Sequence, residues 1–223
     1  AHGRPAAGSG SGGVSRLRYN RSEAVGHLRA ACPEMARFVE DCGAFKLKVA
    51  KADLFNALSS AIIYQQLSGK AAATIHGRFR DLFPDGVPEA SQVSQLSTEA
   101  LRGAGLSNNK TLAIRDLAEK SLDGSLASSR YMGRLDDDEV INNLCRVRGI
   151  GPWTAQMYLI FNLGRPDVMP ATDLGVQKGV QYVYGREELP TPDQVMDITA
   201  HLAPYRSAAS WYFWIAADTG LIT

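Results

Sequence analysis

The most informative segment of the chain reads Leu144-Cys145-Arg146-Val147-Arg148-Gly149-Ile150-Gly151-Pro152-Trp153-Thr154-Ala155. Its pattern predicts a helix that begins near Asp136 or Asp137 and ends at the Gly-Ile-Gly turn, and a second helix that begins at once with Pro152 in its first turn. Glycines at such a turn leave backbone amides bare at a helix N-terminus, where the helix dipole favours an anion such as a DNA phosphate. A tight turn that only joins two core helices is the commoner explanation of so short a motif.

A loop with several glycines and prolines follows the second helix and leads to an aspartate. It reads Asn162-Leu163-Gly164-Arg165-Pro166-Asp167-Val168-Met169-Pro170-Ala171-Thr172-Asp173-Leu174-Gly175-Val176. Asp173 is predicted to open a helix that runs to about Tyr184 and is closed by Gly185. By itself, an aspartate at this position is explained as a helix N-cap, because its side chain accepts hydrogen bonds from the first backbone amides.

The rest of the chain is also patterned for helices. Apolar residues recur at helical spacing, as in Ala71, Ile75, Phe79 and Leu82, and no two-residue turn separates alternating runs. A capping box begins at Thr191 and ends at Gln194. These patterns predict an all-α domain of about ten helices over residues 14–223, built as two lobes around a cleft. Residues 1–13 contain too little apolar material to fold and are predicted to be a flexible tail.

Composition limits the class of protein without revealing its function. The 223 residues are 45% hydrophobic and 21% charged, and no apolar run approaches the roughly 20 residues of a membrane span. The first residues do not resemble a secretory signal, and three cysteines without metal-ligand spacing indicate a reducing, intracellular setting. A net charge of +1 does not by itself suggest a nucleic-acid partner, although a locally positive face remains possible.

At four places the chain resembles the helix-hairpin-helix DNA glycosylase superfamily and, within it, the DNA-3-methyladenine glycosylase II (AlkA) family. The matching runs are Ala61-Ile62-Ile63-Tyr64-Gln65-Gln66-Leu67-Ser68, Gly149-Ile150-Gly151-Pro152-Trp153-Thr154-Ala155, Asp167-Val168-Met169-Pro170 with Asp173-Leu174-Gly175-Val176, and Pro204-Tyr205-Arg206-Ser207. They occur in the family's order between about Leu54 and Trp214, which is more specific than any single match. The resemblance implies a two-lobed helical fold with a DNA-binding cleft, without the extra N-terminal β domain of some members.

The resemblance implies an enzyme of base excision repair that flips an alkylated base, of the 3-methyladenine or 7-methylguanine type, out of the duplex and hydrolyses its N-glycosidic bond. Asp173 would be the catalytic carboxylate, because breaking this bond develops positive charge on the sugar. An alkylated, cationic base leaves with little acid assistance, so one carboxylate suffices. Members that nick the strand through a Schiff base carry a lysine where this sequence has Trp153, which predicts a monofunctional enzyme that uses water.

Aromatic faces attract an electron-poor, positively charged base, which makes the aromatic residues near the motifs candidates for a base pocket. The predicted pocket residues are Trp153, Tyr158, Trp211 and Met157. Trp153 occupies a family position and is the preferred candidate, whereas helix packing is the commoner explanation for Tyr158, Trp211 and Trp214. The family usually has aromatic residues where this chain has Leu202 and Met157, so the range of substrates is left open.

The resemblance also implies a set of DNA-contacting residues: Gly149, Gly151, Thr154, Gln65, Gln66, Leu67 and Arg206. In the loop of Gln65, Gln66 and Leu67, a side chain would fill the gap that the flipped base leaves in the stack. A polar loop between two helices is the alternative interpretation, and the sequence does not say whether Gln66 or Leu67 fills the gap. Arg206 would line the cleft or reach a phosphate, and an ordinary structural ion pair would explain it as well.

The histidines lack ligand spacing and no cysteine follows Cys145, so neither a catalytic divalent metal nor an iron–sulfur cluster is expected. The resemblance alone implies a structural Na⁺ or K⁺ at the carbonyls of Cys145, Val147 and Ile150. The expected partner is double-stranded DNA with damaged bases, bound by a monomer in the bacterial cytoplasm and nucleoid or the eukaryotic nucleus. Two alternatives stay open: a glycosylase for deaminated or oxidised bases, and a non-catalytic protein that binds DNA damage.

Overall fold

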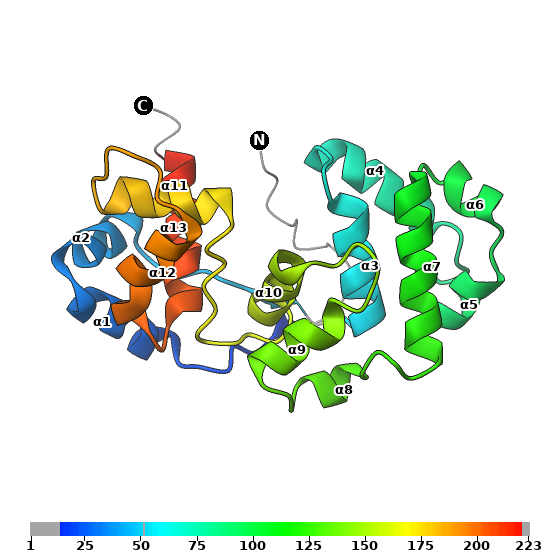
Figure 1. Ribbon diagram of the computed structural model, residues 1–223, viewed down its shortest axis with the longest axis horizontal. Coiled ribbons are helices and arrows are strands. Elements are labelled where there is room, and N and C mark those ends of the chain that lie inside the picture. The colour runs from blue at the N-terminus through cyan, green and yellow to red at the C-terminus, as the bar shows by residue number, and fades with distance from the viewer. Residues whose placement is uncertain (1–13, 51, 220–223) are drawn as a thin grey trace. The chain divides into compact units, whose positions relative to one another are not determined.

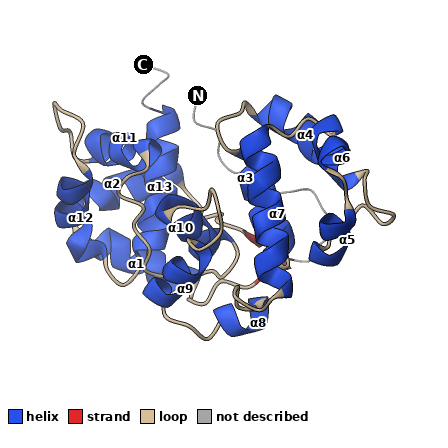
Figure 2. Cartoon of the chain, turned by 45° about the vertical axis from the view of Figure 1, so that its right-hand side comes forward, coloured by secondary structure: helices blue, strands red, loops and turns tan. Residues whose placement is uncertain are grey.

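The computed structural model describes residues 14–50 and 52–219, so the predicted tail over residues 1–13 lies outside the described part of the chain. Within that part, thirteen α-helices, one 3₁₀ turn and two strands of two residues each confirm the predicted all-α fold (Figure 2). The sequence predicts about ten helices, and three of the thirteen found there are short: α5 (Ala90–Gln95), α6 (Thr98–Gly103) and α8 (Ser129–Met132). Helices of one or two turns carry too few apolar positions to show a period.

The chain divides into two compact units, of which the first comprises residues 52–158 of the described chain and is called the hairpin unit. Besides the three short helices, it contains α3 (Leu54–Tyr64), α4 (Gly69–Arg80), α7 (Asn108–Leu122), α9 (Asp137–Leu144) and the first part of α10 (Pro152–Phe161). The longest helix, α7, packs against α3 and α5 (Figure 1). Its buried residues Ile114 and Leu117 join Leu58 and Ile62 of α3 in the core of this unit.

The second unit comprises residues 14–50 and 159–219 and is called the terminal unit. Its elements are β1 (Val14–Ser15), α1 (Arg21–Ala31), α2 (Pro33–Cys42), β2 (Val49–Ala50), α11 (Leu174–Val183), α12 (Pro192–Thr199), η1 (Ala200–Leu202) and α13 (Arg206–Thr219). The strands pair antiparallel, with Val14 opposite Ala50. Helices α11 and α13 form the most extensive contact between two elements, around the buried residues Val176, Val180 and Phe213.

Capping residues fix where the helices begin. Asp173 is the N-cap of α11, and Thr191 and Gln194 form the predicted capping box at the start of α12. A further capping box joins Asp136 and Glu139 at the start of α9, in the predicted place. In the described residues, no helix combines the length and the apolar character needed to cross a membrane.

Candidate active site and DNA-facing elements

The carboxylate of Asp173 is held by two donors in the terminal unit. Its Oδ1 accepts one hydrogen bond from the backbone N–H of Val176 and another from the indole Nε1–H of Trp214, both at 2.9 Å. The first bond is that of an N-cap, as the sequence predicts, whereas the second comes from α13 and is not required to start a helix. Asp173 is only partly buried, so the group is oriented by the protein and still reachable by solvent.

Trp214, for which the sequence favours helix packing, is not among the predicted site residues. Its ring stacks on Phe161, with centroids 5.5 Å apart and planes inclined by 27°. The indole fits beside Asp173 because residue 175 is a glycine: a Cβ there would lie 2.9 Å from Cδ1 of Trp214. No local pattern distinguishes Trp214 from Trp211, since the partner of its N–H is 41 residues away in the chain.

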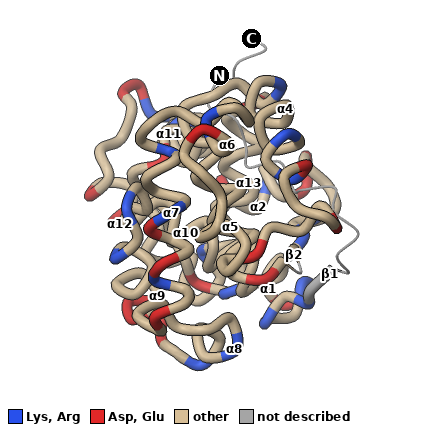
Figure 3. Tube along the Cα trace, turned by 90° about the vertical axis from the view of Figure 1, so that its right-hand side faces the viewer, with Lys and Arg blue, Asp and Glu red and all other residues tan. Residues whose placement is uncertain are grey.

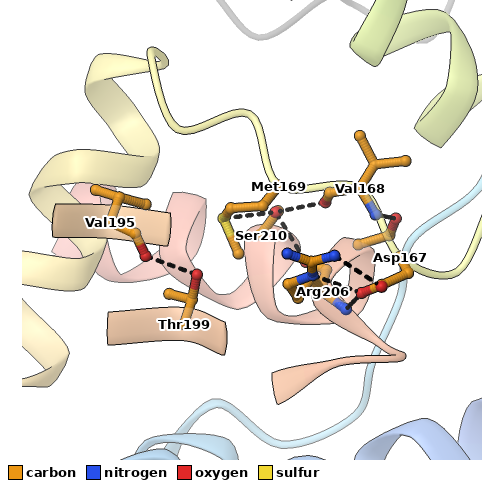
Figure 4. A network of polar contacts seen from close by, with 8 residues as sticks. Asp167, Val168, Met169, Val195, Thr199, Arg206 and Ser210 are labelled. Carbon is orange, nitrogen blue, oxygen red and sulfur yellow. Dashed lines mark hydrogen bonds and ion pairs between the residues drawn. The ribbon is translucent and has the colours of Figure 1, made fainter. Parts of the chain in front are cut away.

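A polar network fastens the loop before Asp173 to the start of α13 (Figure 4). The guanidinium of Arg206 forms a forked ion pair with Asp167, with Nε 2.7 Å from Oδ1 and Nη2 2.8 Å from Oδ2. The hydroxyl of Ser207 accepts the backbone N–H of Val168 at 3.0 Å, and the hydroxyl of Ser210 donates to the carbonyl of Val168 at 3.3 Å. The loop that precedes Asp173 is therefore bonded to α13, the helix that also carries Trp214.

The ion pair with Asp167 corresponds to one of the two roles that the sequence left open for Arg206. Burial opposes the ionisation of Asp167, but the hydrogen bonds and charge of Arg206 outweigh it and hold the pKa of that carboxyl below its usual value. Two guanidinium nitrogens of Arg206 are committed to Asp167. The structural ion pair is therefore present, and contact of Arg206 with a phosphate stays a prediction.

The hairpin lies between α9 and α10, in the predicted helix-hairpin-helix arrangement. The chain turns after α9 through a hydrogen bond from the Ile150 N–H to the Val147 carbonyl at 3.0 Å, and α10 starts with the Ala155 N–H donating to the Gly151 carbonyl at 3.1 Å. Gly149 has a φ of +79°, a conformation that favours glycine. Gly151 has no positive φ, and a Cβ there would meet nothing within 4 Å. Only the first glycine is thus required by the turn itself.

The predicted gap-filling loop connects α3 to α4, whose N-cap is Ser68 as expected. Nε2 of Gln65 donates to the carbonyl of Gly149 at 2.9 Å and lies 3.5 Å from Oγ1 of Thr154. The structure therefore brings three of the predicted DNA-contacting residues together. Gln66 is exposed and has a φ of 57°, the only positive φ of a non-glycine residue in the described chain. Leu67 is partly buried.

Two of the four residues predicted to line a base pocket are buried in the core, and the other two are partly exposed. Met157 and Tyr158 are 7% and 4% exposed, and Trp211 packs edge-on against Phe45 with ring centroids 5.1 Å apart. Trp153, in the first turn of α10, is partly exposed. The structure thus gives Met157, Tyr158 and Trp211 a packing role, their contact with a base stays a prediction, and the aromatic side chain beside Asp173 is Trp214.

Charges of both signs are interspersed along the chain (Figure 3), in keeping with the net charge of +1. No group of three or more His, Cys, Asp or Glu side chains in the described residues is arranged to hold a metal ion. The hairpin would receive an anion through backbone amides, whose partial charges do not appear in a count of lysines and arginines.

The chain is similar in sequence to known proteins. Residues 59–204, which include the loop, the hairpin and Asp173, match the family model of the HhH-GPD superfamily base excision DNA repair protein. The sequence is 33% identical over 191 residues to DNA-3-methyladenine glycosylase 1 of Schizosaccharomyces pombe, covering 84% of each chain.

Two solved structures are similar. One is the S. pombe 3-methyladenine DNA glycosylase in complex with abasic DNA, with a TM-score of 0.79 and 33% identity over 86% of this chain and 95% of that one. The other is a DNA-3-methyladenine glycosidase from Bacillus halodurans, with a TM-score of 0.83 and 34% identity over 92% and 95% of the two chains.

Proposed function

The chain belongs to the HhH-GPD superfamily of base excision DNA repair proteins, and from this premise we propose that it is a monofunctional DNA N-glycosylase that releases alkylated bases, with Asp173 as the catalytic carboxylate. The observation that carries the proposal is the carboxylate of Asp173, held by Val176 and Trp214 at the start of α11. The relatives named as 3-methyladenine glycosylases support the substrate class, since they match this chain over most of its length.

The chemistry follows from the charge that develops as the glycosidic bond breaks. The departing base takes the bonding electrons, and the sugar acquires oxocarbenium character that a nearby carboxylate stabilises. Two donors on Oδ1 of Asp173 fix the orientation of that carboxylate, so no reorganisation is needed when the charge appears. Water then adds to the sugar. A base already made cationic by alkylation needs little protonation, which agrees with a single catalytic carboxylate.

Most of the predicted DNA-contacting residues lie in the hairpin unit. We propose that backbone amides near Gly149 and Gly151 hold a phosphate, and that Gln66 or Leu67 fills the space left by the flipped base. Gln66 is the better placed of the two, because its side chain is exposed while that of Leu67 is partly buried. The partner is double-stranded DNA with a damaged base, bound by a monomer inside the cell.

A monovalent cation at the hairpin is part of the same proposal. The carbonyl oxygens of Cys145, Val147 and Ile150 would hold it, and hard oxygen donors suit such an ion. The Val147 carbonyl already accepts the Ile150 N–H at 3.0 Å, and its second lone pair is available to a cation. A bound cation would add positive charge next to the phosphate site.

The test is release of free base from duplexes that each carry one defined lesion. We expect release from duplexes with 3-methyladenine or 7-methylguanine, with the strand intact until alkali is added and no adduct trapped by borohydride. Release confined to deaminated or oxidised bases would overturn the proposed specificity. Binding of every damaged duplex without any release would instead indicate a non-catalytic damage-binding protein.

A further inference from the structure

Lys110, in the first turn of α7, is bonded to the end of another helix. Its ammonium group donates to the carbonyl of Ile63 at 2.6 Å and to the carbonyl of Gln65 at 2.9 Å. The last carbonyls of a helix lack partners within that helix and carry its negative dipole end, so α3 ends on a positive charge. Burial lowers the pKa of Lys110, as expected for an ammonium that is partly removed from water.

Gln65 is bonded both to Lys110, through its backbone, and to the hairpin, through its side chain. Lys110 binds the backbone carbonyl of Gln65, while the side chain of Gln65 binds the carbonyl of Gly149. Gln66 follows directly, with its side chain exposed and its backbone in the left-handed region at φ 57°. A glutamine adopts this conformation only where its surroundings impose it. The hydrogen bonds of Lys110 and Gln65 restrain the backbone directly before Gln66.

We propose that Lys110 is a positioning residue for base flipping: it locks the loop between α3 and α4 so that Gln66 is presented to the gap in the base stack. The inference rests on the proposed function and adds to it a residue that contacts the loop and not the substrate. Two of the three donors of the ammonium are bound to carbonyls within the protein, which distinguishes Lys110 from a lysine that serves a phosphate.

The role predicts which substrates depend on Lys110. Opening a paired base costs stacking and pairing energy, and a side chain already placed to fill the gap offsets part of this cost. Without the hydrogen bonds of Lys110, the loop between α3 and α4 relaxes and Gln66 no longer compensates for the cost of opening the base pair. The loss matters for a lesion that must be unpaired and matters little for a lesion opposite an abasic site, which has no pairing partner.

The experiment measures single-turnover base release by Lys110→Met from duplexes that carry the same lesion either opposite its normal partner or opposite an abasic site. We expect release from the paired duplex to slow by about tenfold or more, and release from the unpaired duplex to change by less than about threefold. Lys110→Arg, which keeps the charge and the donors, should restore most of the rate. Lys46→Met is the matched control, since Lys46 is an exposed lysine of the terminal unit and its loss also removes one positive charge.

Equal slowing on both duplexes, or no slowing on the paired one, would overturn the inference. Helical content and melting temperature are measured for each variant, and Lys110→Leu, which also lacks a hydrogen-bond donor, replaces Lys110→Met should the latter fail to fold. Base release by the wild-type protein separates this inference from the proposed function. A wild-type protein that releases no base from either duplex contradicts the proposed function, whereas normal release with unchanged selectivity in the variant contradicts only the role of Lys110.

Discussion

Trp214 contributes two separable interactions to the candidate site, the stacking of its ring on Phe161 and the hydrogen bond of its indole to Asp173. An N-cap aspartate is common in helical proteins, and the amide of Val176 would satisfy it. The second donor fixes the rotation of the carboxylate, which matters for electrostatic stabilisation of the sugar but hardly for starting a helix. The two interactions predict different consequences for activity and stability.

Trp214→Phe removes the N–H donor and keeps an aromatic ring on Phe161. Without this donor the carboxylate is no longer held in one orientation, so we expect base release to slow by about tenfold to a hundredfold. A hydrogen bond to a charged group also contributes about 1.5 to 3 kcal/mol to stability, so the melting temperature should fall by several degrees without loss of the fold. Gly175→Ala should produce a similar loss by a second route, because its Cβ would lie 2.9 Å from the indole. Gly26→Ala is the control, since a Cβ at that position of α1 meets nothing within 4 Å. Base release by Trp214→Phe at the wild-type rate would show that the indole serves only for packing.

At the scale of the element, three neighbouring residues of the hairpin unit contact the turn between α9 and α10. Gln65 donates to the carbonyl of Gly149, the carboxylate of Asp116 on α7 accepts the N–H of Arg148 at 2.7 Å, and Ala113 of α7 packs beneath Gly149. Burial opposes the ionisation of Asp116, but the hydrogen bond from the Arg148 backbone and the salt bridge to Lys120 outweigh it and lower the pKa of this carboxyl. The hairpin is therefore positioned before any DNA is present.

The two hairpin glycines should behave differently when replaced by alanine. Gly149→Ala forces a Cβ into a left-handed conformation, so we expect a cost of about 1 kcal/mol in stability and a lower melting temperature. Gly151→Ala has open space in the free protein, so its stability should be unchanged while binding to damaged and undamaged duplexes weakens alike. Affinities are compared at one stated salt concentration. Normal DNA binding by a well-folded Gly151→Ala variant would reduce the hairpin to a structural turn.

At the scale of the whole molecule, the features that the sequence predicted are those encoded by neighbouring residues. The N-caps Asp173 and Thr191 and the turn at Gly149 depend on side chains and backbone within a few positions, so their local pattern was sufficient. Contacts between distant residues were not predictable in this way. The bond from Trp214 to Asp173 and the lock of Lys110 on the end of α3 join residues more than 40 positions apart.

The candidate site shows the same division. The sequence supplied Asp173 as a candidate because a carboxylate after a hairpin matched a family pattern, but it offered two roles for Arg206 and could not rank the aromatic residues. The folded structure adds contacts that the sequence could not supply: Arg206 is paired with Asp167, Trp211 contacts Phe45, and Trp214 donates to the carboxylate of Asp173. Which aromatic side chain of α13 reaches Asp173 depends on how α13 packs against α11, and that packing is a property of the folded unit.

The central claim is that Asp173 is a catalytic carboxylate and not only an N-cap, and Asp173→Asn tests it most directly. Asparagine is also a good N-cap, so the variant keeps α11 capped while removing the negative charge. The measurement is the single-turnover rate of base release from a duplex with one alkylated base, beside the melting temperature and DNA affinity of the same variant. The account predicts a loss of about a hundredfold or more, on the order of 3 kcal/mol, with folding and binding retained. A folded Asp173→Asn protein that releases the base at nearly the wild-type rate would contradict it.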